Sequence, residues 1–177
     1  MPVLPSAHSP SLPVDPAPAR VYMPQSASHI QALQRLEQRF QSMPPVAAMA
    51  PIIEGFDGQR LCVNAPLDLH VNDKGCAFGG SMVSLMTLAS WGLVTMQVEA
   101  AGLDAGIYVA DSQVRYLHPV YEDLRITAEL APSGGWDAFI ATLRQRRRAR
   151  ISLVARLMLA DGRLATDFSA RYVAIAR

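Results

Sequence analysis

A polar loop followed by two adjacent glycines holds the residues best placed to do chemistry. Asn72 lies in this loop, and Gly79 and Gly80 follow it within a run of 24 residues, from 75 to 98, that contains no Asp, Glu, Lys, Arg or His. If the run is helical, the N–H groups of its first turn have no internal partner and carry the positive end of the helix dipole. The pattern therefore predicts a site for an anion or a developing oxyanion, although tight packing of the loop also explains the glycines.

Other polar side chains nearby are candidates for the rest of the chemistry. Ser81 and Ser84 fall in the first turns of the expected helix, where they either hydrogen-bond a substrate or water or serve as small packing residues. Activation of a water molecule requires a general base. The carboxylates that could act in this way are Asp111, in the segment after the helix, and Asp73, in the loop, and either could reach the site within one chain or across a dimer interface.

The sequence gives no indication of a metal or a bound cofactor. The four histidines, at positions 8, 29, 70 and 118, are scattered, and no CxxC or HExxH motif is present. His70 and His118 lack the context of a catalytic triad. Two cysteines without motif spacing favour a reducing, cytoplasmic location. A formal net charge of +1 argues against broad binding to nucleic acid or to an anionic membrane.

The segment "LRQRRRAR", residues 143–150, is the one strongly basic stretch. We expect Arg147 and Arg148 at or near a hairpin tip between two strands, with Arg146 beside them as a further candidate contact. Such a tip is either a solvated surface feature or a contact for phosphate groups or an acidic protein surface, because arginine pairs well with phosphate.

Hydrophobic periodicity predicts the elements that position these residues. Apolar residues at helical spacing predict an amphipathic helix over 28–42, which Pro44 and Pro45 stop. The Asp57–Gly58 step predicts a hairpin between two short strands. The charge-free run is long enough to cross a membrane, but its many Gly, Ser and Thr residues favour a buried core helix.

Beyond residue 102 the sequence alternates like strands, and we expect four or five of them, including one at "WDAFIATLRQ" (136–145). The order of elements predicts an α+β domain, in which an antiparallel sheet of five to six strands covers one long central helix. Seven prolines in the first 27 residues predict a disordered tail over 1–27, so that the domain occupies 28–177.

The motif "NDKGCAFGGSM", the later "SWGL" and the segment "VRYLHPV" together resemble the hotdog-fold thioesterase superfamily. The resemblance is strongest to the YiiD C-terminal type of thioesterase domain and covers roughly residues 30–176. It implies a curved antiparallel sheet wrapped around the helix and a homodimer or dimer of dimers. It also implies a substrate that is an acyl thioester of coenzyme A or acyl carrier protein, whose carbonyl is held by Asn72 and by the helix N-terminus at Gly79 and Gly80.

The sequence departs from the better-understood branch of this superfamily. Phenylacetyl-CoA-thioesterase-like members have a histidine before the two glycines and a carboxylate further along the helix, and the corresponding residues here are Phe78 and Thr87. The helix therefore carries no evident general base for hydrolysis. The resemblance implies two alternatives: decarboxylation of malonyl-acyl carrier protein in support of fatty acid synthesis, which needs no such base, and binding of acyl thioesters without turnover.

Overall fold

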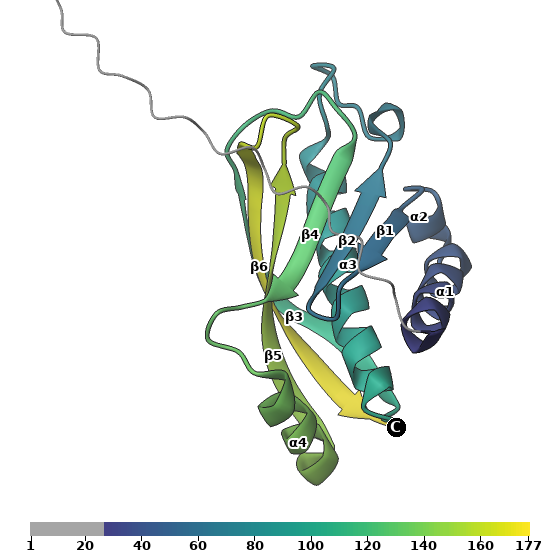
Figure 1. Cartoon of the computed structure of the whole chain (residues 1–177). Coiled ribbons are helices and arrows are strands. Elements are labelled where there is room, and N and C mark those ends of the chain that lie inside the picture. The colour runs from purple at the N-terminus through teal and green to yellow at the C-terminus, as the bar shows by residue number, and fades with distance from the viewer. Residues whose placement is uncertain (1–26) are drawn as a thin grey trace, which may run out of the picture.

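The computed structural model describes residues 27–177; the tail predicted over 1–27 lies, apart from Ala27, outside the described residues. The centre of the domain is one curved antiparallel sheet with the strand order β1-β2-β4-β5-β6-β3 (Figure 1). The strands are β1 (Ile52–Phe56), β2 (Arg60–Ala65), β3 (Ala105–Tyr116), β4 (Leu124–Leu130), β5 (Arg148–Met158) and β6 (Leu164–Ala176). This arrangement confirms the predicted α+β class and the hotdog architecture.

The charge-free run forms the long helix α3 (Gly79–Ala100), which lies against the concave face of the sheet (Figure 1). It is apolar on nearly all sides, and 67% of its most apolar stretch of 18 residues is buried inside the fold. By length and composition alone α3 is able to cross a membrane, but a core helix passes the same test. Its burial follows from the sheet that surrounds it.

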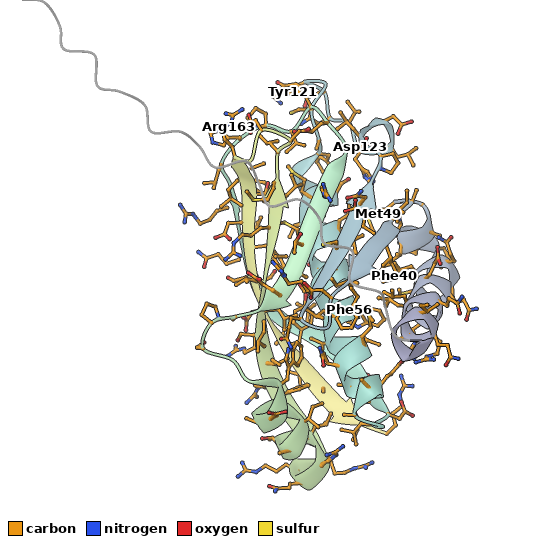
Figure 2. The ribbon with its side chains drawn as sticks, in the orientation of Figure 1. Phe40, Met49, Phe56, Tyr121, Asp123 and Arg163 are labelled. Carbon is orange, nitrogen blue, oxygen red and sulfur yellow. The ribbon has the colours of Figure 1, made fainter. Side chains whose placement is uncertain are left out.

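The N-terminal helix was predicted correctly, to within one residue. It forms α1 (Ala27–Ser42) and is followed by one short turn of helix, α2 (Pro44–Ala47). Leu36 and Phe40 of α1 are buried against the core, and Figure 2 shows Phe40 on the α1 side of the domain. Close packing here depends on Gly92 of α3, where an added Cβ would lie 3.0 Å from Leu36 Cδ2.

The predicted hairpin between β1 and β2 is also confirmed. The side chain of Asp57 caps its turn by accepting hydrogen bonds from the backbone N–H groups of Gln59 and Arg60, at 2.9 and 2.7 Å. Gly58 has a φ of 95°, in the left-handed region that favours glycine.

The strand predicted at "WDAFIATLRQ" is wrong, because this segment is the helix α4 (Trp136–Arg146). Its apolar side chains recur at helical spacing: Phe139 and Leu143 are buried, and Trp136 and Ile140 are half-buried against the same core. Alternation is weaker than this i, i+4 pattern, and the packing against β5 decides in favour of the helix. As a result, α4 covers the end of the sheet where α3 ends (Figure 1).

Candidate functional site

The loop before α3 is shaped by Asn72. After the short 3-10 helix η1 (Leu67–Leu69), the Asn72 side-chain oxygen accepts hydrogen bonds from the backbone N–H groups of Lys74, at 2.8 Å, and Cys76, at 3.3 Å. Its amide nitrogen lies 3.3 Å from Cys76 Sγ and 3.4 Å from the carbonyl oxygen of Ala77. Asn72 therefore holds its own loop, and its side chain is not free to point at a substrate in this conformation.

Helix α3 begins without a side-chain cap. The residue before it, Phe78, has extended backbone and donates its N–H to the carbonyl oxygen of His70 at 2.6 Å. Within residues 27–177, the N–H groups of Gly79, Gly80 and Ser81 have no hydrogen-bond acceptor. Three unpartnered donors at the positive end of a 22-residue helix form a site that favours a negatively charged oxygen.

Aromatic rings lie on both glycines. The hydroxyl of Tyr116 donates to the carbonyl oxygen of Gly79 at 2.8 Å, and a Cβ at Gly79 would lie 3.3 Å from the Tyr116 ring. A Cβ at Gly80 would lie only 2.3 Å from the ring of Phe78. The Phe78 side chain is 55% exposed, so its ring has room to turn aside. Both glycines thus allow a flat ring to approach the backbone closely.

A mostly apolar pocket of about 530 Å³ opens beside the helix, one turn beyond the two glycines. This volume lies within the range of about 300–1,000 Å³ that is usual for ligand pockets. Its walls are the α2 region, one face of α3, the first half of β3 and one side chain of β6. The lining residues are Met43, Val46, Met49, Val83, Ser84, Thr87, Leu88, Trp91, Ile107, Tyr108, Val109 and Tyr172. Figure 2 marks Met49, close to the point where α2 leads into β1.

Most polar side-chain groups of this lining are already engaged with the backbone. Ser84 donates its hydroxyl to the carbonyl oxygen of Gly80 at 2.8 Å, and Tyr172 donates to that of Thr87 at 2.9 Å. Burial raises the pKa of the Tyr172 phenol well above its usual range. None of the lining residues is Asp, Glu, His, Lys or Arg, so the pocket itself contains no general base.

Asp111 does not reach this pocket, in contrast to the expectation for a general base. A β-bulge between Val109 and Asp111 reverses the alternation of side chains along β3. Before the bulge, Val109 lies opposite Tyr172 on the helix-facing side; after it, Asp111 lies opposite Arg171 on the outer side, where the two form an exposed ion pair. The other candidate, Asp73, is exposed in the loop and is paired with Lys74.

The three arginines do not lie at a hairpin tip. Arg146 ends α4, Arg147 follows with a left-handed φ of 59°, and Arg148 begins β5. The nearby Arg144 donates to the carbonyl oxygen of Ala101, just after the C-terminal end of α3. Arg144 and these three arginines form a basic cluster near the C-terminal end of α3. Because α3 has 22 residues at about 1.5 Å each, about 33 Å of helix separate this cluster from Gly79 and Gly80 of the same chain.

Sequence reasoning did not find Trp91, Tyr116 or Tyr172. Trp91 was part of the quoted "SWGL" and Tyr116 of "VRYLHPV", but neither was given a role. Their roles depend on contacts with residues distant in sequence: Tyr116 bonds Gly79, 37 positions away, and Tyr172 bonds Thr87, 85 positions away. Within the described residues, no three His, Cys, Asp or Glu side chains are grouped so that they could hold a metal ion.

The sequence model of the family described as "Putative thioesterase (yiiD_Cterm)" matches residues 33–176, which includes the loop, α3 and the whole sheet. The chain belongs to this family. The predicted resemblance to the YiiD C-terminal type is confirmed, and the described pocket and helix N-terminus lie inside the matched region.

Several solved structures have a similar fold. A protein from Shewanella oneidensis described as a "putative thioesterase" is 30% identical, with a TM-score of 0.74, and the match covers 82% of this chain and 99% of that one. A protein of unknown function from Chlorobaculum tepidum TLS is 26% identical, with a TM-score of 0.79 and coverage of 84% and 97%. A thioesterase from Haemophilus influenzae, 16% identical with a TM-score of 0.65 and coverage of 81% and 90%, shares the fold.

Proposed function

We propose that this domain is an enzyme that processes acyl thioesters carried by coenzyme A or acyl carrier protein. The thioester carbonyl binds at the N-terminus of α3, and the acyl group lies in the pocket. One observation carries the proposal: the unpartnered N–H groups of Gly79, Gly80 and Ser81 lie one helical turn from the pocket wall at Ser84. Four residues of helix span about 6 Å, which suits a carbonyl bonded to a chain in the pocket.

The N–H groups act on charge that develops during the reaction. In hydrolysis, the oxygen of water bonds to the carbonyl carbon, negative charge gathers on the carbonyl oxygen, and the C–S bond then breaks to release the thiol with a proton. Donors aimed at this oxygen stabilise the transition state by about 3 kcal/mol each in a water-excluded site. Asn72 contributes by positioning, because its side chain fixes the loop that leads into Gly79.

Decarboxylation of a malonyl thioester is the second candidate, and the absence of any carboxylate or histidine from the pocket lining favours it. In this reaction the bond between the carboxylate and the α-carbon breaks, carbon dioxide leaves, and the electron pair forms an enolate whose oxygen accepts the same N–H bonds. The α-carbon then takes a proton from solvent. No base has to activate water, so the helix N-terminus supplies the main requirement.

The proposal includes a homodimer formed through β3. This strand has 12 residues and lies at the edge of the sheet, where β6 is its only partner among residues 27–177. Tyr108 and Val109 are 57% and 48% exposed at this edge, where they also line the pocket. The unpaired backbone groups of a long edge strand are a template for pairing with a second copy. Sedimentation of the purified protein is expected to give twice the chain mass of 19.2 kDa, and a single-chain mass would exclude the dimer.

Mass spectrometry of the purified protein with malonyl-acyl carrier protein, beside a medium-chain acyl-CoA, tests the reaction. Free thiol from either substrate supports hydrolysis. Acetyl-carrier without free thiol supports decarboxylation. Neither product, together with tight binding of the substrate, would overturn the catalytic proposal and leave a binding protein. Gly80→Val is the site variant, because a Cβ at Gly80 would lie 2.3 Å from the ring of Phe78, so that this ring or the start of α3 would have to move.

A further inference from the structure

The pocket has a direction, because its lining residues on α3 follow one another away from the proposed carbonyl site. Ser84 lies at the near end and Trp91 seven residues further, which is about 10 Å of helix. At the far end the indole N–H of Trp91 donates to the carbonyl oxygen of Ile107 at 3.1 Å, which joins α3 to β3. The pocket is therefore bounded at that end by a fixed side chain.

Beyond Trp91 the core is closed. In the next turns of α3, Thr95 and Val98 are only 6% and 2% exposed, and the Thr95 hydroxyl donates to the carbonyl oxygen of Trp91 at 2.9 Å. An acyl chain that extends along α3 from the helix N-terminus therefore meets the indole ring before it reaches these packed side chains.

The lining also restricts which acyl chains the pocket can bind. It contains no charged residue, and the polar groups of Ser84, Trp91 and Tyr172 donate to backbone carbonyl oxygens. A hydroxyl or carboxylate on the far part of a ligand would lose its hydration and find few partners, whereas each methylene in contact with the apolar wall raises affinity about fourfold.

We infer that Trp91 sets the maximum length of an unsubstituted hydrocarbon acyl chain, so that the substrates are acyl thioesters whose chain ends at its indole ring. This inference rests on the proposed function, since it takes the thioester to lie at the N-terminus of α3. Ile107 is the second determinant, because it faces the same end of the pocket from β3 and lies opposite the buried Ala174 of β6.

Two substitutions at this end change the available length in opposite directions. Trp91→Leu removes the indole and opens the far end, whereas Ile107→Phe adds a ring there and shortens the pocket. Trp136→Leu is the matched control, because Trp136 is also half-buried against the core but lies in α4, outside the pocket. Thermal unfolding of each variant verifies that it is folded.

The test measures binding by calorimetry. The probes are non-hydrolysable S-alkyl ethers of coenzyme A, whose alkyl chains have about four to sixteen carbons. For the parent protein, affinity is expected to rise about fourfold per methylene and then stop rising at one length. Trp91→Leu moves this break to longer chains, Ile107→Phe moves it to shorter chains, and Trp136→Leu leaves it in place. The kcat/KM of the matching acyl-CoA substrates shifts in the same way, with about a tenfold change in the ratio of a long to a short chain.

An unchanged break in both pocket variants would overturn the inference, as would a loss of affinity that is equal at every length or a parent protein that binds none of the ethers. If the break is unchanged but acyl-CoA is still hydrolysed, the length determinant is wrong and the proposed enzyme remains. If the break moves as expected but no thioester is turned over, the length determinant is supported and the catalytic proposal fails.

Discussion

Replacement of Asn72 separates a role in the loop from direct contact with the substrate. Asn72→Asp keeps a side-chain oxygen for the backbone N–H groups of Lys74 and Cys76, and it removes only the amide donors, which make two long contacts of 3.3 and 3.4 Å. Asn72→Ala removes all of these interactions. If Asn72 acts by positioning, Asp is tolerated and Ala is not. If its amide donates to the thioester oxygen, both variants fail.

The magnitudes follow from the bonds that are lost. Asn72→Ala leaves two backbone N–H groups without their acceptor, at about 1 kcal/mol each, which lowers the free energy of unfolding by about 2 kcal/mol. For a domain of this size such a loss lowers Tm by about 4–8 °C. Asn72→Asp is expected to remain within about 1 kcal/mol of the parent, because a carboxylate is a stronger acceptor than the amide it replaces.

Chemical denaturation and initial-rate kinetics, measured on the same preparations, supply the test. The positioning role predicts that Asn72→Asp retains kcat/KM within about tenfold of the parent, whereas Asn72→Ala loses both stability and activity. A donor to the oxyanion is worth about 100- to 1,000-fold in kcat. Such a loss in Asn72→Asp, with parent-like stability, would refute the positioning role.

Three further predictions concern residues around the site. Tyr116→Phe removes the hydrogen bond to the Gly79 carbonyl oxygen and is expected to lower the free energy of unfolding by about 1 kcal/mol in urea denaturation. Asp111→Asn breaks an exposed ion pair on the outer face, so we expect less than about 1 kcal/mol and an unchanged kcat/KM; a large loss of activity would restore Asp111 as a base. Burial raises the pKa of Tyr172 above its ordinary value of 10.0, so its stabilising effect is complete below about pH 10 and is lost as the unfolded chain ionises above that pH. Tyr172→Phe is therefore expected to weaken the alkaline fall in stability, and an identical pH profile would contradict this.

The sequence predicted the elements whose pattern is local. The charge-free run is a core helix, and the turn at Asp57 and Gly58 joins two strands, because both the composition of an apolar run and turn chemistry are visible within a short stretch of sequence. The position of Gly79 and Gly80 at the start of α3 was also predicted from local sequence, because the end of a helix leaves its first N–H groups without an internal acceptor.

What the sequence could not supply depends on contacts between distant residues. Strict alternation along β3 would put Asp111 on the same side as Val109, but the bulge turns it outward, and pairing with β6 is what reveals the bulge. The position of the basic cluster depends on α4. Its helical spacing was present in the sequence, but its packing against β5, a contact between separate elements, is what distinguishes this helix from a strand. The pocket itself arises only when α2, α3 and β3 pack together.

Binding of the thioester carbonyl at the N-terminus of α3 is tested most directly by a crystal structure with a coenzyme A analogue in which a methylene replaces the thioester sulfur and a ketone keeps the carbonyl. We expect the ketone oxygen about 2.7–3.1 Å from N–H groups of Gly79, Gly80 or Ser81, with the alkyl chain directed along α3 toward Trp91. A bound analogue whose carbonyl lies elsewhere, with the N-terminus of α3 still unpartnered, would contradict it.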